Sequence, residues 1–254
     1  DGFGEEAYRT AARRSNETGR PLSLYFHIPF CDTVCFYCAC NKIATKDRSL
    51  AVGYLERVHR EISMQGELFD RSRRVEQLHW GGGTPTFISH EQMRELMQVT
   101  AEHFALADDD SGEYSIEIDP READAQTVAL LRELGFNRMS LGVQDFDPQV
   151  QQTIHRVQPY EQTRELVETA VAGQDGFVVD DCEFHRDGPS YTVDTRAGSG
   201  GEDDAATHCL FVGMDEYVGL PTLRLVRVAV GPEFARRVDC REMFDLGDTS
   251  TRTI

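Results

Sequence analysis

Three cysteines on one short segment have the clearest capacity for chemistry. Cys31, Cys35 and Cys38 follow the spacing C-x3-C-x2-C, and Cys40 comes two residues later. Thiolates this close together can hold one metal centre without ligands from elsewhere in the chain. With Cys40 they would complete a tetrahedral zinc site, whereas three cysteines on a four-iron cluster would leave one iron open to bind and activate a ligand. The spacing alone leaves both alternatives open.

Alternating strands and helices are expected to position this segment. Runs of β-forming residues predict strands over 22–28, 75–80, 114–119 and 138–144. Helical periodicity predicts helices over 49–69, from Ser89 to Phe104, over 125–134 and in segments that end near Ala172. Ser89 and Gln92 have the spacing of a capping box. Four successive βα units imply a parallel sheet, either open or closed into a barrel.

The unusual residues fall at or just beyond the C-terminal ends of these strands. The cysteines follow the first strand and the glycines at 81–83 follow the second, while Glu117 lies late in the third and Gln144 ends the fourth. In a (β/α) barrel this rim is where active sites are built. We therefore expect an α/β fold with a partial TIM-like barrel in which these four features converge on one site.

Composition limits the classes of partner. The 254 residues carry a net charge of −18, which argues against nucleic acid or an anionic membrane as a general partner. No stretch approaches the roughly 20 apolar residues that cross a bilayer. The opening residues also lack the apolar core of a signal peptide, so a cytoplasmic location is expected. Four of the seven cysteines fall within ten residues, which in a reducing compartment suggests metal or redox chemistry rather than disulfides. The other cysteines, Cys182, Cys209 and Cys240, have the scatter of ordinary buried thiols.

The regular alternation fades near residue 173. We expect an N-terminal extension over 1–20, a (β/α) partial barrel over 21–172 and a divergent segment over 173–254. Within the last segment, short apolar runs suggest further strands at 176–181, 209–213 and 223–230. This segment is expected to be a second α/β piece or a poorly ordered tail.

Five motifs in succession resemble one enzyme family. They are YFHIPFCDTVCFYCACNK (25–42), LHWGGGTPTF (78–87), SIEIDPRE (115–122), LGVQDFD (141–147) and IHRVQPYEQT (154–163). Their content and order resemble the oxygen-independent coproporphyrinogen III oxidases, a family of radical S-adenosylmethionine enzymes. The resemblance covers about residues 20–172 and implies the radical SAM type of partial barrel.

The resemblance also implies a set of site residues. Cys31, Cys35 and Cys38 match the ligands of a [4Fe-4S] cluster whose open iron holds the amino and carboxylate groups of S-adenosylmethionine, and Cys40 matches a cysteine that is not a ligand. The positions that match cofactor contacts are Tyr25, Tyr37, Gly82, Gly83, Thr84, Glu117, Gln144 and Arg156. Core packing is the alternative interpretation for the two tyrosines, and a surface charge is the alternative for Arg156.

The implied activity is an oxidoreductase step in porphyrin and haem biosynthesis. Reductive cleavage of S-adenosylmethionine gives a 5′-deoxyadenosyl radical, which takes hydrogen from propionate side chains of coproporphyrinogen III and leads to protoporphyrinogen IX. The implied partners are this small-molecule substrate and an electron donor such as a flavodoxin or ferredoxin, with neither nucleic acid nor a membrane.

A second resemblance begins where the first ends. DCEFHRDGPSYTVDT (181–195), extended by HCLFVGMDEY (208–217), resembles bacterial nicotinate mononucleotide adenylyltransferases, but the phosphate-handling motif that opens that family is absent. A chain that joins the front of one enzyme to pieces of others, truncated or chimeric and inactive, is favoured over a divergent complete enzyme. The alternative functions are an adenylyltransferase-like nucleotide-binding protein and a non-catalytic zinc-binding module.

Overall fold

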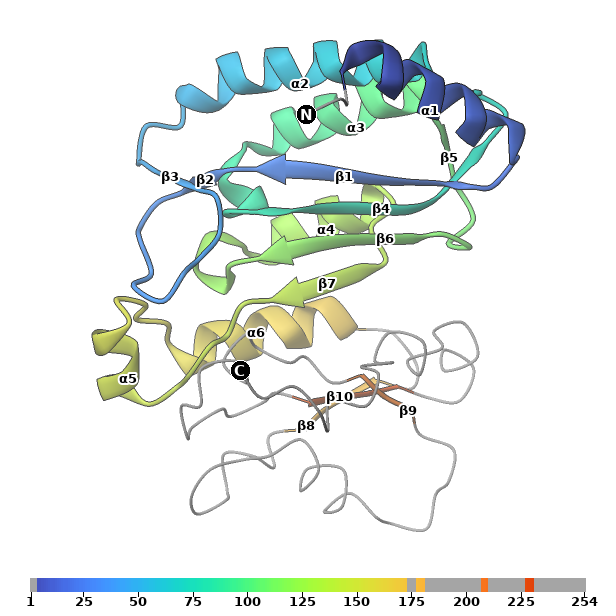
Figure 1. Ribbon diagram of the computed structural model, residues 1–254. Helices are drawn as coiled ribbons and strands as arrows, with labels where there is room; N and C mark the ends of the chain where they lie inside the picture. Colours follow the sequence, from blue (N-terminus) through green and yellow to red (C-terminus); the bar gives the residue numbers. More distant parts are fainter. Residues whose placement is uncertain (1–3, 173–176, 181–206, 210–226, 231–254) are drawn as a thin grey trace, which may run out of the picture. The chain divides into compact units, whose positions relative to one another are not determined.

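The structure is a computed structural model that describes residues 4–172, 177–180, 207–209 and 227–230 (Figure 1). The chain divides into two compact units. The first comprises Asp1–Val143 and Asp147–Leu166, and the second comprises Gln144–Phe146 and Val167–Ile254.

The first unit alternates strands and helices. Its strands are β1 (Leu22–Ile28), β2 (Phe30–Cys31), β3 (Ile43–Ala44), β4 (Arg74–Gly82), β5 (Ala105–Leu106), β6 (Glu113–Ile118) and β7 (Arg138–Leu141). Its helices are α1 (Glu5–Glu17), α2 (Leu50–Gly66), α3 (His90–His103), α4 (Ala125–Glu133), α5 (Pro148–Thr153) and the start of α6 (Tyr160–Val171), with 3₁₀ turns at Pro85–Phe87 and Pro120–Glu122. None of the described helices is long and apolar enough to cross a bilayer.

The main strands form one parallel sheet in the order β1-β4-β6-β7, with β5 paired to β4. Its register places Tyr25 beside His79, His79 beside Ser115 and Ser115 beside Arg138. Among the described strands of this sheet, none closes the gap between β1 and β7, so the sheet is open. The expected α/β fold with a partial parallel barrel is confirmed.

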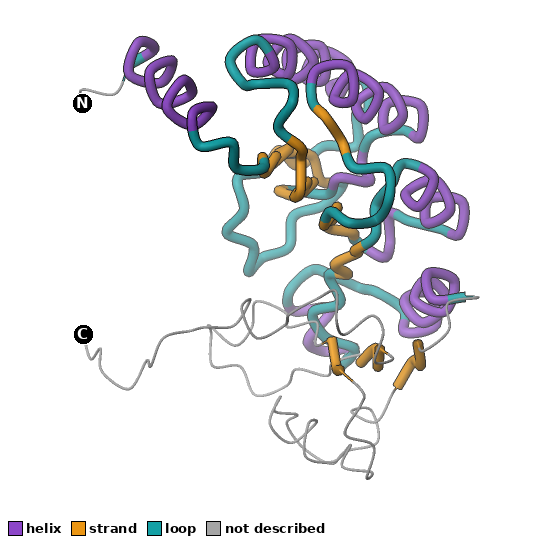
Figure 2. The backbone as a smooth tube through the Cα atoms, turned by 90° about the vertical axis from the view of Figure 1, so that its right-hand side faces the viewer, coloured by secondary structure: helices purple, strands orange, loops and turns teal. Residues whose placement is uncertain are grey.

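Alternate side chains give the sheet an apolar face and a polar face. The apolar face of β1, β4 and β6 carries buried residues, namely Phe26, Ile28, Leu78, Trp80, Tyr114, Ile116 and Ile118. These belong to one core with apolar residues of α2, α3 and α4, such as Leu55, Met93 and Leu130. Figure 2 shows the helices between the strands of this unit lying on one side of the sheet. The opposite, polar face is therefore left to carry the chemistry.

Trp80 lies at the centre of this core. It is fully buried, and its ring meets those of Phe26 and Phe136 edge-on at centroid distances of 6.3 and 4.9 Å. Because truncation leaves a cavity as well as losing buried area, Trp80→Ala is expected to lower the free energy of unfolding by about 3–5 kcal/mol. Met64→Ala, at a 54% exposed position on α2, is the control and should change it by less than about 0.5 kcal/mol. Urea unfolding measures both, and equal losses would contradict this core.

Several local predictions are confirmed. Ser89 and Gln92 form the capping box at the start of α3, with both reciprocal hydrogen bonds present. The helix predicted over 125–134 is present as α4, and Gly135, which follows it, has φ +90°, a common conformation for a glycine that ends a helix. The segment 1–20, for which the sequence predicted no element, contains α1, which is anchored by hydrogen bonds from Tyr8 Oη to Gln65 Oε1 (2.6 Å) and from Asn16 Nδ2 to Leu68 O (2.9 Å).

The end of the fourth predicted strand was wrong. β7 ends at Leu141, three residues before the expected end at Gln144. The backbone of Gly142 still donates to Ile118 O (2.9 Å), but Gln144 has φ 64°, which is incompatible with an extended strand. Gln144 therefore lies in a loop that follows the strand.

In the second unit the described strands are antiparallel. β10 (Arg227–Val230) pairs with both β8 (Phe177–Asp180) and β9 (Thr207–Cys209). The strand expected at 176–181 exists, but it does not extend the parallel sheet. The prediction at 209–213 overlaps β9 at Cys209 alone, and β10 covers the end of the prediction at 223–230. The segment 181–195, which carries the adenylyltransferase resemblance, lies outside the described residues.

Candidate functional site

The cysteine loop (30–44) follows directly on the carboxyl end of β1. Its two ends are joined because β2 pairs in parallel with β3, and the backbone of Thr45 donates to Cys31 O (2.8 Å). Inside the loop, Cys38 N donates to Cys35 O (3.0 Å) and Lys42 Nζ donates to Cys38 O (2.8 Å). The loop is thus folded back on itself, and its thiols lie between two fixed ends.

The thiols interact with one another electrostatically. Burial raises the pKa of Cys31, a hydrogen bond from Thr84 opposes that rise, and the neighbouring Cys38 and Cys35 add to it. Burial first, and then Cys38, raise the pKa of Cys40 to about 11. Three thiols on one short loop are the donor set that an iron-sulfur cluster takes. Within the described part of the chain, no three His, Cys, Asp or Glu side chains converge closely enough to hold a single metal ion.

The glycine segment (81–84) at the end of β4 packs against the start of the cysteine loop. Gly83 N donates to Ile28 O (2.8 Å) and Thr84 N donates to Phe30 O (2.7 Å). A Cβ at Gly83 would lie 2.7 Å from Phe30 O, and Gly82 has φ +116°. Glycine is therefore required here by backbone packing as well as suited to the close approach of a ligand. Thr84 Oγ1 also donates to Cys31 Sγ (3.6 Å).

Gly83→Ala is accordingly expected to lower the free energy of unfolding by about 1–3 kcal/mol, because the added methyl overlaps backbone that cannot rotate away. Gly53→Ala is the matched control: no atom lies within 4 Å of the added Cβ and the residue is on α2, so it should stabilise the chain by up to about 1 kcal/mol. Urea unfolding measures both changes. A neutral Gly83→Ala would show that the loop and the glycine segment are not in contact.

Tyr25, His27 and His79 occupy the polar face of the sheet beside the cysteine loop. The ring of Tyr25 stacks on that of His79 at a centroid distance of 5.7 Å, and its hydroxyl lies 3.0 Å from His27 Nδ1. His27 Nε2 is hydrogen-bonded to Asn41 O (2.8 Å) in the cysteine loop. Tyr25 is 59% exposed, so the core-packing alternative for this tyrosine is wrong. Its ring is available to a ligand on this face.

Glu117 is held at the same rim by the backbone of Gly82 and lies beside His79. Its Oε2 accepts a hydrogen bond from Gly82 N (3.0 Å), and its Oε1 lies 3.6 Å from His79 Nε2. The adjacent His79, together with the hydrogen bond from Gly82, holds the pKa of Glu117 below its usual value despite partial burial. Glu117 is therefore ionised at neutral pH and can accept hydrogen bonds from an amino group or from hydroxyls.

Arg156 reaches the cysteine loop from the segment that follows α5. The residue is only 8% exposed, so the surface-charge alternative is wrong. Its Nη1 donates to Cys35 Sγ (3.4 Å) and lies 3.1 Å from Asp119 Oδ2, while Nη2 donates to Gly142 O (2.7 Å). The side chain of Arg156 thus joins the segments that follow β6 and β7 to the cysteine loop.

Tyr37 and Gln144 are the two remaining candidates for cofactor contacts. Tyr37 is half-buried within the cysteine loop, between Cys35 and Cys38. Gln144 belongs to the second unit, and its Oε1 is buried with no hydrogen-bond partner among the described residues.

Sequence reasoning missed a clamp on the cysteine loop. Arg48 Nη2 lies 2.8 Å from both Asp32 Oδ1 and Glu122 Oε2, while its Nη1 donates to Phe87 O (2.7 Å). The guanidinium carbon also lies 4.0 Å above the Phe87 ring. Arg48 therefore fixes the loop against the segments that follow β4 and β6. No spacing rule reveals this clamp, because its members are brought together only by the fold.

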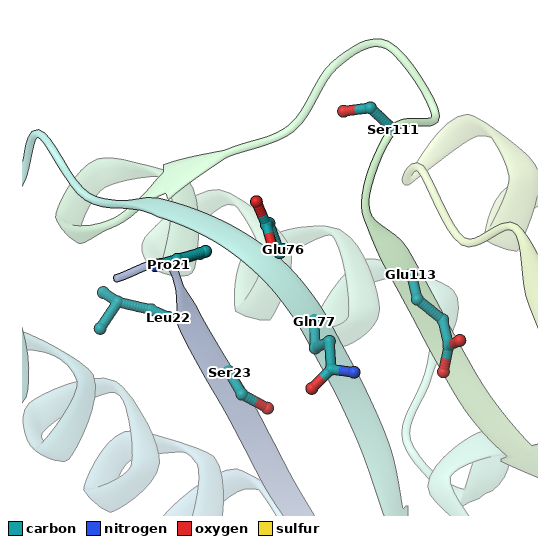
Figure 3. Close-up of a pocket in the computed structure, with 7 residues that line it drawn as sticks. All are labelled: Pro21, Leu22, Ser23, Glu76, Gln77, Ser111 and Glu113. Carbon is teal, nitrogen blue, oxygen red and sulfur yellow. The ribbon is translucent and has the colours of Figure 1, made fainter. Parts of the chain in front are cut away.

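A separate cavity of about 260 Å³ lies at the opposite ends of the strands (Figure 3). Its lining consists of Pro21, Leu22, Ser23, Glu76, Gln77, Ser111 and Glu113. These residues stand at the amino ends of β1, β4 and β6, and none of them is a predicted site residue. The candidate site at the carboxyl rim is therefore distinct from this cavity.

Known proteins resemble the chain in both sequence and fold. The sequence profile of the Radical SAM superfamily matches residues 25–179. The oxygen-independent coproporphyrinogen III oxidase of Pseudomonas aeruginosa is 57% identical over 170 residues, which cover 67% of this chain and 37% of that protein. The same-named protein of Escherichia coli is 47% identical over 159 residues, which cover 63% and 34%.

A solved structure supports the same relationship. Coproporphyrinogen III oxidase from Escherichia coli, described as a radical SAM enzyme, matches with a TM-score of 0.62 and 44% identity over 66% of this chain and 38% of that one. The chain thus spans little more than a third of the relatives it matches. Because the superfamily profile covers more than half of the 254 residues, the chain belongs to the radical SAM superfamily, whose members use a [4Fe-4S] cluster and S-adenosylmethionine.

Proposed function

We propose that this chain carries the cofactor-binding front of an oxidoreductase of the oxygen-independent coproporphyrinogen III oxidase type. One observation carries the proposal: two residues picked out by resemblance contact cysteines of the candidate cluster loop. Thr84 lies 53 residues from Cys31 and Arg156 lies 121 residues from Cys35, yet each donates to the sulfur. Such convergence of distant residues on thiols is what a built site requires.

Cys31, Cys35 and Cys38 hold the [4Fe-4S] cluster in this proposal, and Cys40 does not. S-adenosylmethionine is held by Tyr25, Tyr37, Gly82, Gly83, Thr84, Glu117, Gln144 and Arg156. The donor set fits in its chemistry, because three thiols lie on one loop whose ends are joined, while the ionised Glu117 and the exposed ring of Tyr25 border the same rim. When bound, the cluster and S-adenosylmethionine supply the electron and the 5′-deoxyadenosyl radical for hydrogen abstraction.

The protein's own contribution is to bind and orient. Glu117, fixed by Gly82 and His79, presents an acceptor for the amino group or the ribose hydroxyls of S-adenosylmethionine. The close-packed glycine segment lets the backbone approach the methionine end. Arg48 and the β2–β3 pairing keep the cysteine loop in one place, so that little ordering is needed when the cofactors bind.

The proposed substrate is coproporphyrinogen III, and the proposed partner is a small electron carrier such as a flavodoxin or ferredoxin, in the cytoplasm. A net charge of −18 gives no support to nucleic acid or an anionic membrane as partners. We propose cofactor binding for the part that matches, which covers little more than a third of these relatives.

Anaerobic reconstitution with iron and sulfide tests the proposal. A brown protein with thiolate-to-iron charge-transfer absorption, and with S-adenosylmethionine binding that depends on the cluster, is the expected result. A colourless protein that takes up one zinc ion would overturn the proposal in favour of a zinc-binding module. Binding of a nucleoside triphosphate by the iron-free protein would instead favour the adenylyltransferase-like alternative.

A further inference from the structure

Asp119 organises two guanidinium groups at the end of β6. Arg121 binds it through two nitrogens, with Nε donating to Oδ1 (3.0 Å) and Nη2 donating to Oδ2 (2.6 Å). Arg156 Nη1 lies 3.1 Å from the same Oδ2. The side chains of Asp119 and Arg156 are only 7% and 9% exposed. A carboxylate between two arginines, shielded from water, is a fixed arrangement of charge.

This arrangement faces one sulfur. Arg156 Nη1 donates to Cys35 Sγ (3.4 Å), and Cys35 is the buried member of the three candidate ligands. Arg121 Nη2 donates to the same Asp119 oxygen that Arg156 Nη1 contacts, so the second guanidinium belongs to the same group of charges behind the sulfur. Asp119 first, and then Cys35, raise the pKa of Arg121 above its usual range. Burial raises the pKa of Asp119, but Arg121 and Arg156 together hold it below its usual value. Two permanent cations and one anion leave a net charge of +1 next to Cys35.

We propose that Asp119, Arg121 and Arg156 are positioning residues that raise the reduction potential of the cluster by acting through Cys35. The inference rests on the proposed function, because it requires a cluster on the cysteine loop. Reduction adds one electron to the cluster, here supplied by dithionite, and neither forms nor breaks a bond. The added negative charge is stabilised by N–H donors to the sulfur and by a nearby net positive charge, both of which raise the potential.

Charge variants predict shifts of opposite sign. Arg121→Gln and Arg156→Gln each remove a cation, so at a fixed potential the ratio of reduced to oxidised cluster should fall about tenfold, equivalent to about 59 mV for one electron. Asp119→Asn removes the anion and should raise the same ratio. Arg138→Gln is the control: it removes an equal charge paired with Glu113 at the amino end of β7, and should change the ratio by less than about twofold because exposed charges are screened.

Redox titration of the reconstituted protein, followed by electron paramagnetic resonance, measures these ratios. Shifts of one sign in all the variants, or no shift beyond that of Arg138→Gln, would overturn the inference, since loss of packing has no reason to follow the sign of the charge. Arg121→Lys retains the cation and should stay within about twofold of the parent, which provides a reading if Arg121→Gln fails to fold. A parent protein that binds no iron would instead overturn the proposed function.

Discussion

Replacing Cys31, Cys35 or Cys38 by alanine is expected to remove most of the iron from the reconstituted protein. Changing a residue behind a metal ligand typically costs about 10–100-fold in metal affinity, and losing a ligand costs at least as much. The three thiols sit on a loop that is closed by β2 and β3, so no other cysteine of that loop except Cys40 is close enough to replace a lost one.

Two further cysteine variants make this prediction selective. Cys40→Ala should keep the iron, because Cys40 is not a ligand in the proposed cluster, whereas a four-thiolate zinc site would be lost with it. Cys209→Ala changes a cysteine in β9 of the second unit and should also keep the iron. Iron and acid-labile sulfide are counted for each protein after anaerobic reconstitution. The assignment fails if Cys31→Ala retains its iron while Cys209→Ala loses it.

The parallel sheet could be predicted from the sequence because its signals are local. Runs of β-forming residues mark β1 and β4, and the capping box at Ser89 marks the start of α3. The end of β7 could not be predicted in the same way. A run that looks strand-like continues to Gln144, and only the left-handed backbone of that residue shows that the strand has already ended.

For the candidate site, the sequence identified the residues but not their contacts. Motif resemblance located the cysteines, the glycines, Glu117 and Arg156, but it did not show what each one touches. Spacing alone made Arg156 a surface charge, because its partners Cys35 and Asp119 lie 121 and 37 positions away along the chain. An unpaired guanidinium away from water is strongly disfavoured, so Arg156 can be buried only because the fold places partners beside it.

The packing of the glycine segment could not be predicted from the sequence either. The resemblance implied that Gly82 and Gly83 contact the cofactor. The structure adds a closer constraint, because at Gly83 the position of a Cβ is blocked by Phe30 O of the cysteine loop itself. Backbone packing between distant segments leaves no periodicity in the sequence, so this requirement and the Arg48 clamp could only be found in the folded chain.

Cleavage of S-adenosylmethionine is expected to survive in this chain far better than turnover of coproporphyrinogen III. The cysteine loop, the glycine segment, Glu117 and Arg156 all belong to the first unit, whose sheet is complete enough to bring them together at one rim. Turnover also needs the tetrapyrrole held at reacting distance. The match covers only 37% and 34% of the relatives from Pseudomonas aeruginosa and Escherichia coli, so most of the length of those proteins, with any substrate contacts it supplies, lies outside the match.

The physical reason for separating the two activities is positional. Misplacing a reacting group by about 1 Å can cost about 100-fold in rate, whereas cleavage of a cofactor bound at the cluster needs no substrate in place. Formation of 5′-deoxyadenosine should therefore be slow but measurable, with protoporphyrinogen IX at least about 100-fold lower. Anaerobic assays with dithionite measure the two products separately, and Cys38→Ala provides the control that should form neither. Brisk formation of both in a fixed ratio would show that the segment after residue 172 completes the enzyme, and that the chain is no truncated or chimeric front.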